Sequence, residues 1–417
     1  MNYKNIKTNN KGFYYYKTDD FATIKIAHYF TYKLTKENYL KAVILSVYLF
    51  KANSIYKSEK EICDREKELY GTYLSDHNFY WGKKGMFSFE LKMINPRIIE
   101  EDYFKEAMDF YKDIMLKVNF NNNKLKKDVF EQIKKDIINE VKDDYKNPKY
   151  LCDMNFYTKL LPNSTYHINK VSDLEEFIER VNNVTDKDII DFYNELMNNY
   201  VLSRAFGNLL DEEIKYIENL FDFKQIDFDY DYFVKDKMVT KDIEIIDSNT
   251  TQSSIRFCYD IKNYSKDKYY LYDNICWIIG DYNGPLYRIF REKLGIIYSC
   301  YCDYCRGMFY IVLQIDKKNK DKAIEGMKEL NEYLNDKKKV SKLLDYVKEF
   351  RNNLLITNSE SFDSNVFKVN NYLFKNDKSE EEIVELTNKL TVEDIINELD
   401  NFEYKCLYFY RGDKNEE

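Results

Sequence analysis

The first residues that could carry chemistry are Arg291 and Tyr298, which lie seven positions apart on either side of Gly295. The pattern predicts Arg291 in the last turn of a helix, Gly295 at its left-handed end and Tyr298 on the next strand. A guanidinium and a phenol on rigid elements can both donate to one carbonyl oxygen, and such a donor typically contributes about 2.7–4 kcal/mol to transition-state stabilisation. The plain alternatives are an arginine that caps a helix and a tyrosine that packs in the core.

Histidine chemistry is poorly supported. The chain has three histidines, His28, His77 and His167, and they lie far apart. No HxxEH, HExxH or HxxxH pair that could hold zinc is therefore present. A histidine-dependent hydrolase would have to use one of these isolated residues.

Cys300, Cys302 and Cys305 are the densest group of possible metal ligands. Three thiolates make a poor structural zinc site because such sites use four ligands, although Cys276 or a partner residue could supply the fourth. We interpret the three as free thiols in a hairpin of the second half of the chain.

The composition indicates a folded protein with a large core. The 417 residues are 44% hydrophobic and include only 11 Gly and 4 Pro, which excludes disordered and collagen-like chains. The formal net charge is −8, with 72 acidic and 64 basic residues interspersed. This balance argues against a general binder of nucleic acids or anionic membranes, which would need a basic face.

Three further features suggest a cytoplasmic protein without a membrane partner. The longest apolar run, Tyr39–Phe50, is shorter than the about 20 residues that a membrane-spanning helix needs. The N-terminal residues lack the apolar segment of a secretory signal. Eight cysteines are too sparse for a disulfide scaffold, so we expect reduced thiols.

The chain repeats itself. Three pairs of similar segments occur in the same order: Gly85–Met93 and Gly307–Ile315, Val184–Ile190 and Leu390–Ile396, and Ala205–Asn208 and Tyr410–Asp413. The members of each pair lie about 200 residues apart, which indicates duplication. We predict two homologous halves, 1–221 and 242–417, with a linker at 222–241.

In each half, the sequence pattern predicts a strand, two helices, a hairpin, several helices and a last strand, in this order. This order predicts the α+β class, with two homologous α/β-roll halves that each have a mostly antiparallel sheet and helices packed on one face. In the first long helix, we expect an N-cap at Thr35 and a core-facing stripe, formed by Leu40, Val43, Ile44, Val47 and Tyr48.

Residues 284–299, GPLYRIFREKLGIIYS, are the most distinctive segment of the second half. The segment resembles the pattern S-R-L-F…R-E-K-x-G-L-A-Y-S of the insulinase/pitrilysin-type metallopeptidases, and the element order extends this resemblance over nearly the whole chain. The nearest match is their short two-domain branch, which includes the mitochondrial processing peptidases. The family has a glycine-containing loop before its arginine helix. The resemblance therefore implies that Gly280 and Gly284 touch the substrate.

Active members of this family carry an HxxEH zinc motif on the first long helix. The motif is followed by Leu-Phe-Lys-Gly, which is similar to Leu49–Ala52 here. Counting back, the two histidine ligands fall on Val43 and Val47, and the general base falls on Ser46. Valine cannot bind zinc and serine cannot replace the carboxylate. Glu140 takes the place of the third ligand, although a surface glutamate would look the same. Because Glu140 alone cannot hold zinc, we expect no metal in this chain.

In the family, an arginine and a tyrosine at this spacing reach into a catalytic site on the opposing half or subunit. The resemblance implies that Arg291 and Tyr298 bind the substrate backbone and stabilise the oxyanion. We therefore predict the non-zinc subunit of a heterodimeric zinc metallopeptidase, whose partner is an HxxEH-containing family member that holds zinc and whose substrate is an unfolded peptide. The alternatives are a catalytically dead scaffold or peptide-binding protein, and a metal-dependent enzyme built on Cys300, Cys302 and Cys305.

Overall fold

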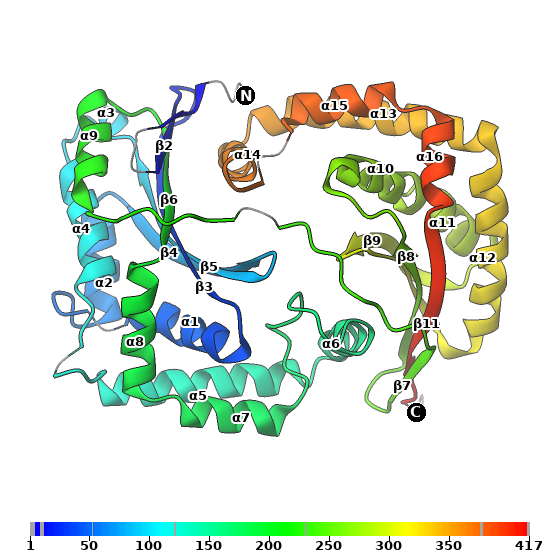
Figure 1. The fold of residues 1–417 in the computed structure, drawn as a ribbon, viewed down its shortest axis with the longest axis horizontal. Coiled ribbons are helices and arrows are strands. Elements are labelled where there is room, and N and C mark those ends of the chain that lie inside the picture. Colours follow the sequence, from blue (N-terminus) through cyan, green and yellow to red (C-terminus); the bar gives the residue numbers. More distant parts are fainter. Residues whose placement is uncertain are drawn as a thin grey trace. The chain divides into compact units, whose positions relative to one another are not determined.

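The computed structural model describes residues 5–8, 12–51, 53–120, 122–229, 232–375 and 378–414. The chain forms two compact units. The first contains residues 1–143, 173–232 and 362–376, and the second contains residues 144–172, 233–361 and 377–417. Each unit is built on one β-sheet with packed helices, as Figure 1 shows. This architecture confirms the predicted α+β class.

The first unit has a six-stranded sheet with the order β1-β2-β6-β3-β5-β4. All neighbours are antiparallel except β2 and β6, which are parallel. Its strands are β1 (Lys7–Thr8), β2 (Phe13–Lys17), β3 (Thr23–Lys33), β4 (Tyr73–Trp81), β5 (Lys84–Ile94) and β6 (Tyr200–Gly207). Its helices are α1 (Lys36–Leu49), α2 (Glu59–Glu68), α3 (Pro96–Ile99), α4 (Phe104–Leu116), α5 (Lys127–Asp144), α7 (Leu174–Asn183), α8 (Asp186–Met197), α9 (Asp211–Leu220) and α14 (Phe362–Lys375).

The second unit has a five-stranded sheet with the order β7-β11-β8-β10-β9, in which only β7 and β11 are parallel. Its strands are β7 (Ile243–Asp247), β8 (Gln252–Ile261), β9 (Ile297–Cys305), β10 (Met308–Asp316) and β11 (Phe402–Gly412). Its helices are α6 (Pro148–Leu160), α10 (Tyr269–Gly280), α11 (Pro285–Tyr287), α12 (Lys320–Asn335), α13 (Lys337–Ser359), α15 (Glu380–Lys389) and α16 (Val392–Leu399).

The two sheets place the repeated segments at equivalent positions. β5 and β10, which carry the Gly-Met-Phe strings, each lie between an inner strand and the outermost strand of their sheet. Thr185 with Asp188 and Thr391 with Asp394 form matching capping boxes at the starts of α8 and α16. Thr35 caps α1 as expected, because its side chain accepts a hydrogen bond from the N–H of Asn38.

The strands of each sheet alternate between two packed faces. In β3, the ring of Tyr32 contacts Phe192 of α8 on the face that carries most of the helices. Tyr29 points to the opposite face and meets Phe374 of α14. The largest core of the second unit lies between its sheet and α10 to α13.

One helix on the opposite face of each sheet comes from a distant part of the chain. α14 follows the second sheet's hairpin in sequence, yet its Val366 and Val369 pack against Phe206 of the first sheet. α6 lies in sequence between helices α5 and α7 of the first unit, yet its Phe156 packs against Tyr310 and Tyr408 of the second sheet. The two units are defined by contacts between residues. The predicted boundaries 1–221, 222–241 and 242–417 are defined by the sequence repeat instead, and they stay a prediction.

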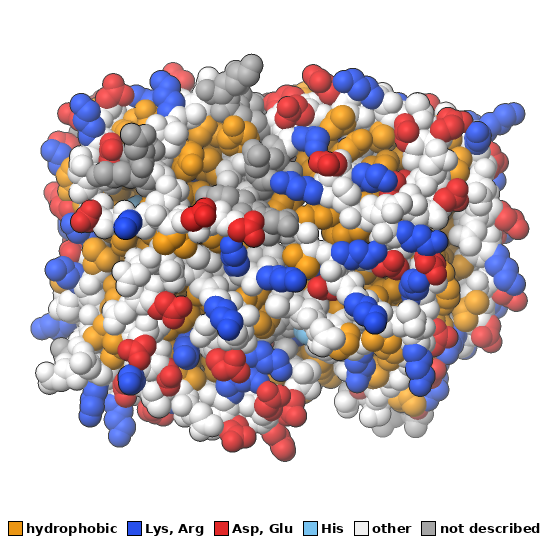
Figure 2. Space-filling view, viewed as in Figure 1, with side chains coloured by type: hydrophobic (Ala, Val, Ile, Leu, Met, Phe, Trp, Pro, Cys, Tyr) orange, Lys and Arg blue, Asp and Glu red, His pale blue; other side chains and the backbone are white. Residues whose placement is uncertain are grey.

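The connection between the halves contains no helix or strand at residues 222–229 and 232–241. On the face drawn in Figure 2, Lys and Arg side chains are scattered among Asp and Glu. Among the helices of the described ranges, none combines the length and apolarity needed to cross a bilayer.

Candidate functional site

The site begins at a wide helical turn in the second unit. Arg291 lies in one turn of π-helix, Arg288–Lys293, that continues α11. The turn closes through hydrogen bonds from the N–H of Leu294 to the carbonyl of Ile289 and from the N–H of Ile296 to the carbonyl of Phe290, both at 3.0 Å. Such turns are rare and often occur at functional sites.

Gly295 then reverses the chain. Its φ of +60° is the left-handed conformation that glycine adopts without steric cost. β9 starts two residues later, at Ile297. The predicted order of helix end, glycine stop and strand is therefore present.

Tyr298 is the extra residue of a β-bulge. In the β9–β10 ladder, Ser299 is opposite Gln314 and Ile297 is opposite Ile315, so Tyr298 has no directly opposite residue. A bulge interrupts the alternation of a strand and redirects a side chain. Tyr298 and Ser299 are both exposed here, which an unbroken alternation would not produce.

Both candidate donors already make a hydrogen bond. The guanidinium of Arg291 donates to the carbonyl of Ile297, the residue just before Tyr298. The hydroxyl of Tyr298 donates to the carboxylate of Asp316 at 2.7 Å. Arg291 is exposed and Tyr298 is 54% exposed. The structure thus brings the two side chains to the start of the same strand, where both can reach solvent.

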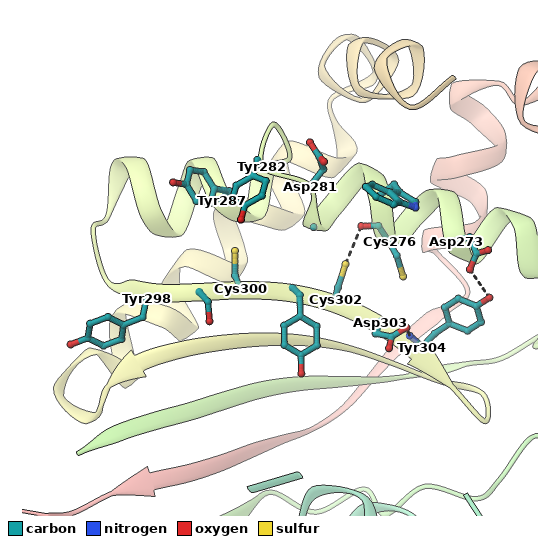
Figure 3. A pocket seen from close by; sticks show the side chains of 14 residues that line it. Asp273, Cys276, Asp281, Tyr282, Tyr287, Tyr298, Cys300, Cys302, Asp303 and Tyr304 are labelled. Atoms are coloured by element: carbon teal, nitrogen blue, oxygen red, sulfur yellow. Dashed lines mark hydrogen bonds between the residues drawn. The ribbon is translucent and has the colours of Figure 1, made fainter. Parts of the chain in front are cut away.

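A groove of about 490 Å³ runs from Tyr298 along β9 (Figure 3). Its other wall is α10 with the turn that follows. Gly280, the last residue of α10, lines this groove. A Cβ on Gly280 would lie 3.0 Å from Sγ of Cys302, so the glycine lets helix and strand approach closely.

Gly284 has a different position from Gly280. It is buried beyond the end of α10, and its N–H donates to the carbonyl of Asp281 at 2.8 Å. A Cβ there would lie 2.6 Å from the carbonyl oxygen of Ile279. Packing alone therefore accounts for Gly284, and substrate contact by Gly280 or Gly284 stays a prediction.

The degenerate zinc-motif positions lie on one side of α1. Val43, Ser46 and Val47 are half-buried. The expectation that Val43 and Val47 belong to a core-facing stripe is therefore wrong. The core side of α1 is instead formed by Leu40, Ala42, Ile44, Leu45, Tyr48 and Leu49. Because a helical turn takes 3.6 residues, Val43 and Val47 lie about one turn apart on the same side of α1. That side is next to the core side of the helix.

The residues at this place do not fit a zinc ion. Val43 and Val47 offer no donor atom, and Glu140 is an exposed residue of α5. On the edge strand β4, burial raises the pKa of Asp76, and hydrogen bonding with Ser46 opposes this shift. Ala52, the last residue of the sequence landmark, lies outside the described residues.

The cysteines do not form an alternative metal centre. Within the described ranges, no group of three or more His, Cys, Asp or Glu side chains is arranged to hold a metal ion. Cys300 and Cys302 point from β9 toward α10, and the thiol of Cys302 lies 3.3 Å from the carbonyl oxygen of Cys276 (Figure 3). Cys305 is buried against the other face of the sheet.

The family model described as the peptidase M16 inactive domain matches residues 183–349. In this stretch, which is less than half of the chain, the sequence resembles the M16 peptidases. The sequence contains no HxxEH zinc motif, and that Val43, Ser46 and Val47 stand at its positions stays a prediction from the resemblance. No curated protein matches the sequence.

Solved structures show that the M16 fold extends over the whole chain. A conserved protein from Enterococcus faecalis V583 has a TM-score of 0.81 and 16% identity, over 99% of this chain and 100% of that one. A peptidase M16 inactive domain from Pseudomonas fluorescens has a TM-score of 0.75 and 15% identity, over 99% of both chains. The periplasmic protease PqqL from Escherichia coli matches 96% of this chain with a TM-score of 0.66 and 12% identity, and the match covers 44% of PqqL.

Sequence reasoning located Arg291 and Tyr298 but missed Asp316 and the three aspartates that line the groove, Asp273, Asp281 and Asp303. Asp316 meets Tyr298 only because the bulge shifts the register of β9 against β10. No spacing along the chain could show this contact. Asp281 and Asp303 could have been noticed as acidic residues within the predicted glycine loop and hairpin.

Proposed function

We propose that this chain is the non-zinc subunit of a heterodimeric zinc metallopeptidase. Its partner would be an M16 member with an HxxEH motif, which would hold the zinc ion. Arg291 and Tyr298 would donate hydrogen bonds to the carbonyl oxygen of an unfolded peptide in the partner's site. The observation that carries the proposal is the bulge, which turns Tyr298 out of the strand beside the residue that Arg291 contacts.

The chemistry of the pair suits a developing oxyanion. A guanidinium has five N–H donors, and the bond from Arg291 to Ile297 uses part of this capacity. Tyr298 has a single hydroxyl proton, so it would exchange Asp316 for the substrate. Two donors aimed at one oxygen stabilise negative charge, and each contributes about 2.7–4 kcal/mol in comparable sites.

The decisive test is reconstitution with the HxxEH-containing M16 member of the same genome. Zinc content and cleavage of an unstructured peptide library are measured for each chain alone and for the mixture. We expect a stable complex, zinc in the partner only, and cleavage by the mixture only. The proposal fails if the partner cleaves equally well alone.

A second candidate is a scaffold or peptide-binding protein without catalysis. One observation favours it. Arg291 and Tyr298 both make hydrogen bonds within the chain, and these bonds could serve only to stabilise the start of β9. In that case, Arg291→Ala would lower the free energy of unfolding without changing cleavage by the mixture. If the chain is instead the proposed subunit, Arg291→Ala would lower cleavage by the mixture without lowering the free energy of unfolding.

A cytoplasmic location is part of the proposal. Its support is that all eight cysteines are free, as expected for a reducing compartment. Fractionation of the native cells tests the location, and recovery with the periplasmic proteins would contradict it.

A further inference from the structure

Two thiols meet between the walls of the groove. Cys276 lies on α10, and Cys302 faces this helix from β9. The Sγ atom of Cys302 lies 3.3 Å from the carbonyl oxygen of Cys276, and Figure 3 shows both side chains in the space between helix and strand. Both residues line the groove and are half-buried, so small molecules dissolved in the solvent can reach them.

Helix and strand approach each other closely at this place. Gly280 follows Cys276 by four residues, so the two lie on the same side of α10. A Cβ on Gly280 would lie 3.0 Å from Sγ of Cys302 and 3.3 Å from its backbone nitrogen. Cysteines form a disulfide when their Cα atoms are about 4.4–6.8 Å apart. The absence of a side chain at Gly280 lets α10 and β9 come together to the short separation that such a bond requires.

The two thiols also interact directly. A hydrogen bond with the thiol of Cys302, together with burial, raises the pKa of Cys276. Cys276 therefore stays protonated at neutral pH, and attack on an oxidant starts at Cys302, because the thiolate is the nucleophile. A second thiol within hydrogen-bond reach can then act as the resolving partner, as in redox-sensing cysteine pairs.

Cys300 is a poorer partner for Cys302. The two residues lie two positions apart on β9, and their side chains both point toward α10 (Figure 3). Residues at this spacing in a strand are about 6.6 Å apart. A disulfide brings the Cβ atoms to about 3.8 Å, which side chains that point the same way along a strand do not reach. Cys276 is therefore the preferred partner.

A second pair of thiols provides an internal comparison. Cys258 of β8 and Cys406 of β11 are directly opposite each other in their ladder, and a hydrogen bond links the two thiols. Both residues are 0% exposed. Close spacing alone would favour oxidation of both pairs. Access of a dissolved oxidant favours only the pair in the groove.

We propose that Cys276 and Cys302 form a reversible disulfide when a small-molecule disulfide enters the groove. With glutathione disulfide, the thiolate of Cys302 attacks one sulfur, which breaks the S–S bond and releases one glutathione thiolate. The thiol of Cys276 then loses its proton to solvent and attacks Sγ of Cys302, which releases the second glutathione. Two protein thiols are oxidised, and one glutathione disulfide is reduced to two thiols.

The bond would join the two walls of the groove. It would also close a loop of the chain that contains Arg291 and Tyr298. In a reducing compartment the pair would stay as thiols until glutathione disulfide accumulates, since cytosolic disulfides are usually transient. The inference does not rest on the proposed function, because the reaction needs neither partner, zinc nor peptide.

The test exposes the folded full chain to excess glutathione disulfide. It uses the variant Cys63→Ser, because Cys63 is an exposed thiol outside the groove. Unfolding in N-ethylmaleimide blocks every remaining thiol, and mass spectrometry of the digested chain follows without reduction. We expect the loss of two free thiols and a peptide linked through Cys276 and Cys302, which dithiothreitol removes. Cys258 and Cys406 should both carry maleimide.

Matched serine variants assign the role of each thiol. Cys276→Ser should stop the reaction after the first step and leave glutathione bound to Cys302. Cys302→Ser should give no linked peptide and should slow the loss of the Cys276 thiol. Cys300→Ser is the control and should still form the linked peptide. Circular dichroism and urea denaturation confirm that each variant is folded.

Several results would overturn the inference. They are a folded chain that keeps all its thiols, glutathione that stays on Cys302 in the presence of Cys276, a link between Cys300 and Cys302, and a link between two molecules. Equal oxidation of Cys258 with Cys406 would also contradict it, because access to the groove would then not select the pair. The measurement on the chain that retains both thiols decides the question even if a serine variant does not fold.

Discussion

The hydroxyl of Tyr298 donates a hydrogen bond to the carboxylate of Asp316, with 2.7 Å between Oη and Oδ1. Tyr298 is 54% exposed, and the side chain of Asp316 is 39% exposed. Water competes for both groups, so this bond contributes only about 0.5–1.5 kcal/mol to stability. The hydrogen bond to Asp316 therefore orients Tyr298, and it is weak enough for the hydroxyl to exchange Asp316 for another acceptor.

Tyr298→Phe should therefore separate stability from activity. Loss of the hydroxyl should lower the free energy of unfolding of the isolated chain by less than about 1.5 kcal/mol. In the reconstituted complex, the same change should lower kcat roughly 100-fold, as loss of an oxyanion donor does. Urea denaturation and steady-state kinetics measure the two effects, and Tyr346→Phe on α13 is the control. Normal kcat with a large loss of stability would assign Tyr298 a structural role.

The zinc-motif positions can be tested by reversal. Val43→His with Val47→His should let the isolated chain bind one zinc ion, because the two side chains lie on one side of α1 and are partly open to solvent. Adding Glu140→Gln should lower the zinc affinity about tenfold or more if Glu140 stands at the third ligand position. Isothermal titration calorimetry measures both affinities. Unchanged affinity after Glu140→Gln would remove Glu140 from the set.

The two glycines of the loop should differ in their tolerance of alanine. At Gly284, a Cβ would lie 2.6 Å from the carbonyl oxygen of Ile279, so Gly284→Ala should cost about 1–3 kcal/mol of stability. At Gly280, the closest atom is Sγ of Cys302 at 3.0 Å, and we expect a smaller loss for Gly280→Ala. Chemical denaturation compares the two variants. Equal losses would contradict the packing account of Gly284.

His28 should make stability depend on pH. Burial lowers its pKa to about 3, and its Nδ1 lies 2.9 Å from the hydroxyl of Tyr111, which itself donates to the carbonyl of Phe89. The unfolded chain takes up this proton near the ordinary pKa of about 6.5, whereas the folded chain does not. The free energy of unfolding should therefore fall from pH 6.5 toward pH 3, by about 1.4 kcal/mol per pH unit from this residue alone.

Comparison of wild type with His28→Gln by urea denaturation between pH 5 and 8 isolates that slope. The stability advantage of the wild type should shrink below pH 6.5. His77 is the opposite-sign control, because hydrogen bonding to Glu90 raises its pKa. Its contribution is complete below pH 6.5 and is lost as the pH rises through the higher pKa of the folded state. An advantage for wild type over His28→Gln that stays constant would contradict the burial of a neutral His28.

Local signals carried the sequence predictions that were confirmed. Thr35 could be recognised as a cap because capping is decided within one turn of the same helix. Gly295 could be placed because a left-handed helix end favours glycine wherever it occurs. The element order and the repeat led to the fold class because the two sheets have corresponding strand orders apart from β1, which occurs in the first sheet alone among the described residues.

Tertiary relationships could not be read in this way. The amphipathic pattern of α14 shows that one side is buried, but not that Val366 and Val369 meet the first sheet. The bulge at Tyr298 depends on how β9 aligns with β10, and the contact with Asp316 depends on that bulge. The side of α1 that holds Val43 and Val47 was misassigned because an apolar residue at helical spacing is the same in sequence whether it is buried or half-buried.

The central claim is that this chain completes the active site of a partner, and kcat of the preassembled complex with Arg291→Ala tests it most directly. Assembly is first confirmed by size-exclusion chromatography. Arg288→Ala, an exposed arginine in the same helical turn, is the control. We expect an intact complex whose kcat falls by roughly 100-fold or more with Arg291→Ala and stays unchanged with Arg288→Ala. An intact complex that retains full kcat with Arg291→Ala would contradict the account.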